Sequence, residues 1–128
     1  MEIHHIGYAV SNIDLAIEQF RLLGYSVGDV IVDDYRHVYI AFARQGAYCI
    51  ELIAPNGEHS PVSKILQKNG PTPYHICYVV DDMDASLALL KEQNWVLIVP
   101  PANAIAFDNR TVAFVYNRSV GIAELLAR

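Results

Sequence analysis

An internal repeat restricts the fold of this 128-residue chain more than any other feature of its sequence. His5–Val10 (HIGYAV) returns as His75–Val80 (HICYVV), and in both copies an aspartate follows four residues later at the start of an apolar-periodic segment. The copies also end alike, because Cys49–Ile53 (CIELI) and Ile122–Leu126 (IAELL) both place one glutamate inside an apolar run. The sequence therefore predicts a duplicated module, with one histidine near the start and one glutamate near the end of each copy.

The composition is typical of one soluble domain with a sizeable core, since 53% of the residues are hydrophobic. The two cysteines, Cys49 and Cys77, are too few for a disulfide framework, and we expect them to be reduced thiols in the cytoplasm. No apolar run reaches the length of a membrane span, and the net charge of −5 comes without a stripe of lysine and arginine. We therefore expect small-molecule or protein partners, and neither nucleic acid nor membrane.

The first module is predicted over residues 1–57 in the order βαβββ. Residues 3–10 alternate as a strand does, and Ser11 or Asn12 can cap a following helix that ends near Gly24. Runs rich in β-branched and aromatic residues predict three further strands, at 25–32, 38–43 and 48–53.

A connecting helix is expected within residues 58–73, with Ser60 as its cap and Pro61 as its first residue. The pattern then restarts over residues 74–128, with a strand at 74–80, a helix capped by Asp81 or Asp82, and strands at 95–99, 111–116 and 122–126. The offset between equivalent residues grows from 70 (75 − 5) to 73 (124 − 51), and 103–110 is the natural place for the extra residues. The predicted fold class is α+β: two paired βαβββ modules that form a curved mixed sheet around a cleft.

Strand alternation places each histidine of the repeat on a defined face, His5 with Gly7 and His75 with Cys77. If the modules pack side by side, both histidines and both glutamates can point into the cleft. Burying the carboxylates without partners would cost on the order of several kcal/mol, so a positive charge must compensate them. A lone histidine or glutamate in a strand is more often a core or surface residue, but independent decoration has no reason to recur in both modules. We therefore predict a divalent metal site made by His5, Glu51, His75 and Glu124.

The remaining histidines and cysteines have less defined roles. His4 points away from the ligand face and is expected to be exposed or to support the site, whereas His37 and His59 have no counterpart in the second module and stay unassigned. Cys49 and Cys77 lie on the ligand face, where they either line the pocket or serve as small buried hydrophobic residues.

Together these segments resemble the vicinal oxygen chelate superfamily, which has the glyoxalase/bleomycin-resistance/dioxygenase fold, and within it they are most similar to the methylmalonyl-CoA epimerases. The resemblance spans almost the whole chain. It is carried by the order and spacing of short motifs: His5–Val10 with Asp14, Ile50–Pro55, Ser60–Pro61, His75–Cys77, Val80–Asp82, Val112–Phe114 and Glu124–Leu125. The resemblance implies one divalent metal ion (Co, Ni, Mn, Zn or Fe) with the ligands His5, Glu51, His75 and Glu124.

The resemblance also implies metal-assisted proton abstraction next to a carbonyl, the chemistry of an isomerase, epimerase or lyase acting on a small carbonyl or thioester substrate. Glu124 would move the proton, with Glu51 as the second choice. Glyoxalase I has a glutamate at the position of Glu51, whereas the epimerases often have a glutamine there. An acidic second base of the epimerases would fall near Asp33 or Asp34.

The chain departs from the epimerase pattern at two segments. The epimerases have a glycine-rich loop before the Val-Ala-Phe strand and a His-Pro-Lys-Ser segment after it, where this chain has Ala104–Arg110 and Tyr116–Ser119. We expect Arg110 or Arg118 to hold an anionic group of the substrate instead. The residues expected to line the substrate site are Cys49, Cys77, Phe107 and Arg110.

Two other functions stay open at this point. A protein that sequesters a drug or metabolite, as bleomycin-resistance members do, would lack the metal ligands that this chain keeps. An iron oxygenase typically uses two histidines and one carboxylate with three open positions, and Glu51 as a fourth ligand disfavours it. Because exposed sheet edges in such folds are commonly covered by a second subunit, we expect a homodimer.

Overall fold

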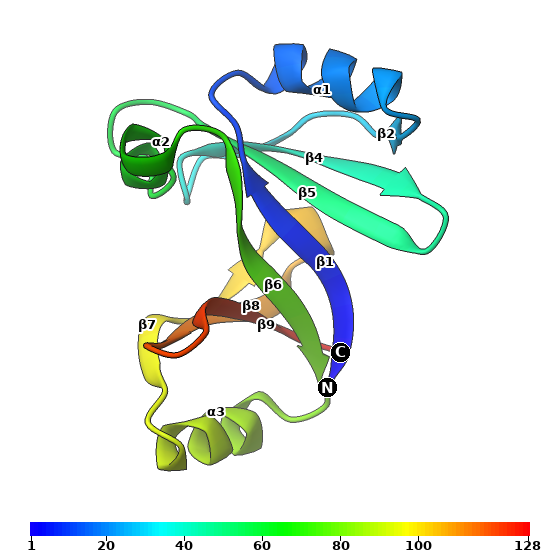
Figure 1. Cartoon of the computed structure of the whole chain (residues 1–128). Helices are drawn as coiled ribbons and strands as arrows, with labels where there is room; N and C mark the ends of the chain where they lie inside the picture. The colour runs from blue at the N-terminus through cyan, green and yellow to red at the C-terminus, as the bar shows by residue number, and fades with distance from the viewer. The chain divides into compact units, whose positions relative to one another are not determined.

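The structure, a computed structural model, describes residues 1–128 and contains nine strands, three α-helices and one 3-10 helix (Figure 1). The chain divides into two compact units. One unit is His5–Tyr74, and the other joins Met1–His4 to His75–Arg128. Strand β1 (Glu2–Ala9) and strand β6 (Thr72–Val80) therefore each begin in one unit and end in the other.

The unit His5–Tyr74 holds most of β1 and the elements that follow it. These are α1 (Ile13–Leu22), β2 (Ser26–Val27), β3 (Ile31–Asp33), β4 (Val38–Gln45), β5 (Tyr48–Pro55) and α2 (Ser63–Asn69). The strand order is β2-β4-β5-β1, and β3 also pairs with β4. Strands β1 and β5 run parallel, whereas β4 is antiparallel to each of its neighbours.

The second unit repeats this plan. Its elements after β6 are α3 (Met83–Glu92), β7 (Val96–Ala104), the 3-10 helix (Ile105–Phe107), β8 (Arg110–Asn117) and β9 (Gly121–Ala127). The strand order is β6-β9-β8-β7, with β6 and β9 parallel and the other pairs antiparallel. In both units the first strand is therefore parallel to the last, and the predicted α+β class with its mixed sheet is confirmed.

Helix α1 covers one face of the sheet in its unit (Figure 1). Ile13 and Ile17 lie one helical turn apart and are buried against Leu52 and its neighbours on the sheet. The buried residues of this cluster are Val10, Ile13, Ile17, Ala41, Ala43, Leu52 and Ala54. Because strand side chains alternate, the face that is left carries His5 and Glu51.

Helices α1 and α3 start at predicted capping residues. The Asn12 side chain accepts a hydrogen bond from the Leu15 backbone N at 3.0 Å, and the Asp82 side chain accepts one from the Ala85 backbone N at 3.0 Å. Gly24 follows α1 with a φ of +98°, a conformation that favours glycine. None of the helices is long and apolar enough to cross a membrane.

Two predicted elements differ from the structure. The single strand expected at 25–32 is two short strands, β2 and β3, because the chain leaves the β4 ladder between Val27 and Ile31. The connecting helix begins at Ser63 rather than at Pro61, and Val62 precedes it in a helical conformation without a side-chain cap. The Ser63 backbone N instead donates to the Ser60 carbonyl in a turn before the helix.

Strand β7 is longer than the predicted 95–99 and includes Pro100 and Pro101. Prolines cannot donate to a sheet ladder, so an irregular edge strand is where they are tolerated. The β7–β8 register accordingly shifts between Leu97 and Val99 and again between Val99 and Ala102. The strand therefore reaches the 3-10 helix that fills part of the expected insertion at 103–110.

Candidate metal centre

The first histidine–glutamate pair lies where β1 and β5 run parallel. Gly7 on β1 is paired with Glu51 on β5. His5 lies two residues before Gly7, so its side chain is on the same face of β1. The His5 Nε2 lies 3.2 Å from the Glu51 Oε1, and the two side chains are 0% and 4% exposed. The imidazole and the carboxylate therefore approach each other diagonally across the two strands.

The second pair repeats this arrangement on β6 and β9. Cys77 is paired with Glu124 across the two parallel strands, and His75 precedes Cys77 by two residues. The His75 Nε2 lies 3.2 Å from the Glu124 Oε1, with side-chain exposures of 0% and 4%. The duplication thus reproduces the strand register and the donor-atom distance as well as the residue types.

A phenylalanine accompanies each pair. Phe42 on β4 is the cross-strand neighbour of the first glutamate, and Phe114 on β8 is that of the second. Each ring meets the histidine of its own pair edge-on, with ring centroids 6.2 Å apart in the first unit and 5.3 Å apart in the second. This role was not predicted from the sequence, although the offset of 72 (114 − 42) between the two phenylalanines falls between the offsets of the histidines (70) and of the glutamates (73).

The donor atoms suit a divalent metal ion. Two ligand atoms about 2.1 Å from a metal, at an angle of about 90–110°, are about 3.0–3.4 Å apart, and the 3.2 Å within each pair falls in this range. Imidazole and carboxylate ligands suit Mn, Fe, Co, Ni and Zn. The side chains whose types and burial could hold such an ion are His5, Glu51, His75 and Glu124.

Both cysteines lie near these pairs, and neither forms a disulfide. Cys77 is fully buried beside Glu124 on the neighbouring strand. Cys49 on β5 is half-buried, two residues from Glu51. Burial raises the pKa of the Cys49 thiol, and the nearby positive charge of Arg44 partly offsets this shift.

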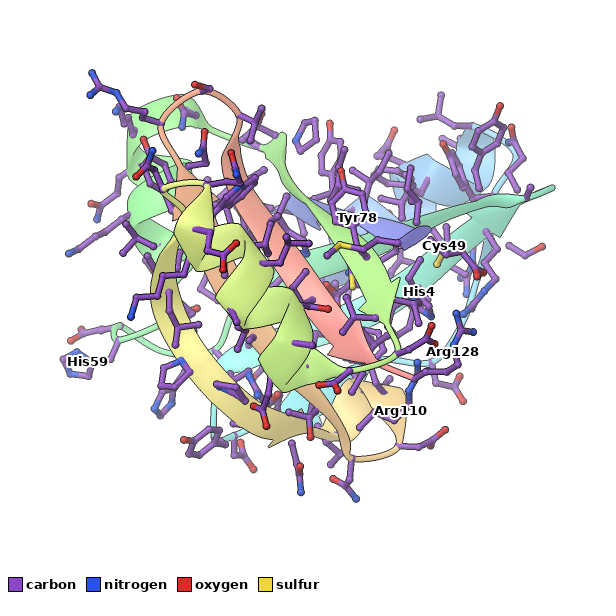
Figure 2. The ribbon with its side chains drawn as sticks, turned by 90° about the horizontal axis from the view of Figure 1, so that it is seen from below. His4, Cys49, His59, Tyr78, Arg110 and Arg128 are labelled. Atoms are coloured by element: carbon purple, nitrogen blue, oxygen red, sulfur yellow. The ribbon has the colours of Figure 1, made fainter.

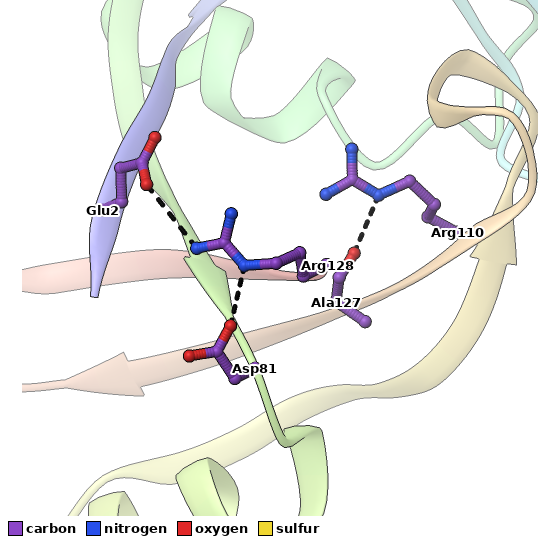
Figure 3. A network of polar contacts seen from close by, with 5 residues as sticks. All are labelled: Glu2, Asp81, Arg110, Ala127 and Arg128. Atoms are coloured by element: carbon purple, nitrogen blue, oxygen red, sulfur yellow. Dashed lines mark hydrogen bonds and ion pairs between the residues drawn. The ribbon is translucent and has the colours of Figure 1, made fainter.

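Phe107 and Arg110 lie around the end of the 3-10 helix. Phe107 is buried and meets the His4 ring edge-on at 5.5 Å, so His4 supports the packing of its unit. The Arg110 Nε donates to the Ala127 carbonyl at 2.8 Å (Figure 3). This hydrogen bond fixes one edge of the half-buried guanidinium, whereas Arg118 is exposed in the turn after β8.

Arg128, the last residue of the chain, has a different setting from Arg110. Its guanidinium donates to Asp81 at 2.7 Å and lies 3.5 Å from Glu2 (Figure 3). The hydrogen bond to Asp81, followed by the contact with Glu2, raises the pKa of the Arg128 guanidinium. The side chains are largely exposed, so this network joins the ends of β1, β6 and β9 on the surface of the unit.

The two unassigned histidines lie on the surface. His37 is exposed in the turn before β4, where its φ is +58°, and its carbonyl accepts from the Asn56 backbone N. His59 is exposed in the loop before α2 and projects from the edge of the molecule (Figure 2). Neither lies within an element that carries a histidine–glutamate pair.

The two aspartates considered for a second base differ in environment. Asp33 is 3% exposed and accepts from Arg36 twice, from the backbone N at 2.9 Å and from Nη1 at 3.2 Å. Asp34 is exposed, and its carboxylate accepts from the Asn56 Nδ2 at 3.5 Å. Asp33 therefore serves the turn that leads into β4, and Asp34 keeps an accessible carboxylate.

Comparisons with known proteins identify the family. The model of the Glyoxalase/Bleomycin resistance protein/Dioxygenase superfamily matches residues 4–114. The ethylmalonyl-CoA/methylmalonyl-CoA epimerase of Cereibacter sphaeroides is 36% identical over 92 residues, which are 70% of this chain and 69% of that protein. The mitochondrial methylmalonyl-CoA epimerase of Mus musculus is 28% identical over 121 residues, or 93% of this chain and 67% of that protein.

Solved structures give the same result. The methylmalonyl-CoA epimerase of Mycobacterium tuberculosis has a TM-score of 0.85 and 27% identity, covering 98% of this chain and 87% of its own. A variant of the methylmalonyl-CoA epimerase of Streptomyces coelicolor, in complex with 2-nitronate-propionyl-CoA, has a TM-score of 0.86 and 25% identity. The match covers 99% of this chain and 96% of that chain. These similarities do not favour the ligand-sequestering alternative. The chain belongs to the glyoxalase/bleomycin resistance/dioxygenase superfamily, within which its relatives are methylmalonyl-CoA epimerases.

Proposed function

We propose that this protein is a divalent-metal-dependent epimerase of a 2-carboxyacyl-CoA thioester such as methylmalonyl-CoA. The observation that carries the proposal is the matched pair of buried histidine–glutamate contacts, each 3.2 Å long and each placed by the same strand register. The relatives named for epimerising methylmalonyl-CoA and ethylmalonyl-CoA support the choice of substrate class and favour an epimerase over a lyase.

We propose that the two pairs bind one metal ion together, through the Nε2 atoms of His5 and His75 and through one oxygen each of Glu51 and Glu124. Co, Ni, Mn, Zn and Fe all accept this donor set. When bound, the cation would stabilise the negative charge that develops on a substrate oxygen after a proton leaves the neighbouring carbon. Coordination through Nε2 leaves the ring proton of each histidine on Nδ1.

Glu124 is the proposed proton carrier. Its carboxylate lies 3.2 Å from the His75 Nε2, and we assign this carboxylate to take a proton from the substrate carbon and to return it. The carboxylate is 4% exposed, and this burial keeps bulk water away from the transferred proton. Glu51, in the equivalent register of the first unit, is the second candidate for the same role.

The walls of the substrate site are proposed from the residues around the pairs. Cys49 lies two residues before Glu51 on β5, and Cys77 lies opposite Glu124 across β6 and β9. Arg110 is oriented by its hydrogen bond to the Ala127 carbonyl, which leaves the two terminal amino groups of its guanidinium for an anionic substrate group. Phe107 would supply an apolar surface next to Arg110.

Metal content and proton exchange test the proposal. Protein purified without a histidine tag should carry close to one divalent ion per chain, and metal-loaded protein in D₂O should incorporate deuterium at C2 of methylmalonyl-CoA, as followed by NMR. His75→Ala should lose both the metal and the exchange. His59→Ala is the matched control and should keep both, because His59 is exposed in the loop before α2.

Equal metal content in wild type and His75→Ala would show that the ligand set is wrong. Metal-loaded wild type without deuterium incorporation would reject the epimerase while leaving the metal site in place.

We also propose that the protein is a cytoplasmic homodimer. Strand β7 ends the strand order of its unit and exposes apolar side chains, with Val96 at 58%, Leu97 at 46% and Ile98 at 47%. A second subunit could cover this edge. The two free thiols support a reducing compartment.

A further inference from the structure

The two modules differ in residue type at the next cross-strand pair on the ligand face after the one that contains the glutamate. On the ligand face of the first module, the cross-strand pair Phe42–Glu51 is followed by Arg44–Cys49. In the second module, the pair formed by Phe114 and its glutamate is followed by Tyr116 and Ile122. The first module therefore has the cationic Arg44 where the second module has the uncharged Tyr116.

Arg44 lies close to the first pair. Its guanidinium carbon is 5.3 Å from the centre of the Phe42 ring, and that ring is 6.2 Å from the His5 ring. Cys49, which pairs with Arg44 across β4 and β5, lies two residues before Glu51. The guanidinium therefore lies over the aromatic ring that also meets the His5 ring.

No carboxylate of the chain neutralises this guanidinium. Arg36 and Arg128 form ion pairs with Asp33 and Asp81, whereas Arg44 takes part in none, although acidic residues outnumber basic ones by 14 to 9. The contact with Phe42 restricts the guanidinium, whose N–H donors lie around the edge of its plane. Arg44 is exposed, so these donors are accessible to a ligand.

We propose that Arg44 binds an oxyanion of the substrate, either a carboxylate of the acyl group or a phosphate of its carrier arm. Guanidinium recognises both groups through two parallel hydrogen bonds. The second module has Tyr116 at the equivalent place and so has no cation there to pair with an anion. Arg44 would thus give the first histidine–glutamate pair an anion-binding neighbour that the second pair lacks. This inference rests on the proposed epimerase function. It makes Arg44 a residue that selects substrates carrying an anionic group.

Titration calorimetry of metal-loaded protein with malonyl-CoA and with malonyl-pantetheine tests the inference. Both ligands carry the carboxylate, and only malonyl-CoA carries phosphates. Arg44→Gln should weaken binding by about tenfold or more, and Arg44→Lys should recover part of the affinity because it keeps the charge without the planar fork. Arg21→Gln is the matched control, because Arg21 is an exposed residue of α1 whose Nη2 donates to the Val27 carbonyl.

The pattern of losses identifies the oxyanion. A loss for both ligands assigns Arg44 to the carboxylate, and a loss for malonyl-CoA alone assigns it to a phosphate. Equal affinities of wild type and Arg44→Gln for both ligands, including undetectable binding by both proteins, would overturn the inference. Metal content and deuterium exchange are measured on the same samples. If Arg44→Gln leaves affinity unchanged while the protein still binds metal and exchanges deuterium, the inference about Arg44 is wrong and the proposed function stands.

Discussion

At the scale of single residues, the substitution Glu124→Gln tests proton transfer separately from metal binding. Glutamine has nearly the shape of glutamate and keeps an oxygen that can face a cation, but its amide cannot accept a proton near neutral pH. We expect Glu124→Gln to keep most of its metal and to exchange deuterium into methylmalonyl-CoA about 100-fold more slowly or worse.

Glu51→Gln is the matched control for this prediction, since Glu51 has the same register and the same 3.2 Å contact with a histidine. It should slow exchange by less than about tenfold if Glu124 is the proton carrier. A severe loss in Glu51→Gln together with near-normal exchange in Glu124→Gln would reverse the two roles.

At the scale of elements, the start of α1 depends on one side chain. The sequence left Ser11 or Asn12 as the cap, and the structure shows the Asn12 side chain accepting from the Leu15 backbone N. Asn12→Ala should lower the free energy of unfolding by about 1 kcal/mol, because a helix N–H loses its partner. Urea denaturation measures this change.

Ser11→Ala is the control at the neighbouring position, where the serine is exposed. It should change the free energy of unfolding by less than about 0.5 kcal/mol. The larger loss in Ser11→Ala would mean that the capping residue of α1 is wrongly assigned. Asp82 in the second module, which accepts from the Ala85 backbone N, should behave like Asn12.

At the scale of the whole molecule, strand β7 determines whether the chain is expected to associate. The 14.3 kDa chain should have twice this mass in light scattering. Ile98→Lys should shift it toward the monomer, because Ile98 is exposed at a register shift and a charge there opposes an apolar contact. Leu89→Lys, at an exposed site on α3, is the control and should leave the mass unchanged. A wild-type monomer would reject the homodimer.

The repeat made much of this fold predictable from the sequence. Alternation and capping residues are local properties, so the strand at 3–10, the helix after Asn12 and their copies after residue 74 could be placed before the structure. The short strands β2 and β3 could not, because the break between them depends on how each pairs with β4. The predicted start of α2 was wrong for a similar reason, because a backbone turn replaces the expected side-chain cap.

The sequence alone determined which residues recur, and therefore which histidine and glutamate belong to each module. Tertiary structure decided the rest of the site. Only the parallel register of β1 with β5 and of β6 with β9 brings each histidine 3.2 Å from its glutamate, some 46 residues (51 − 5) or 49 residues (124 − 75) further along the chain. Only the pairing of β4 with β5 sets Phe42 and Arg44 beside the first pair. Such contacts join distant segments, and strand pairing rather than local preference fixes them.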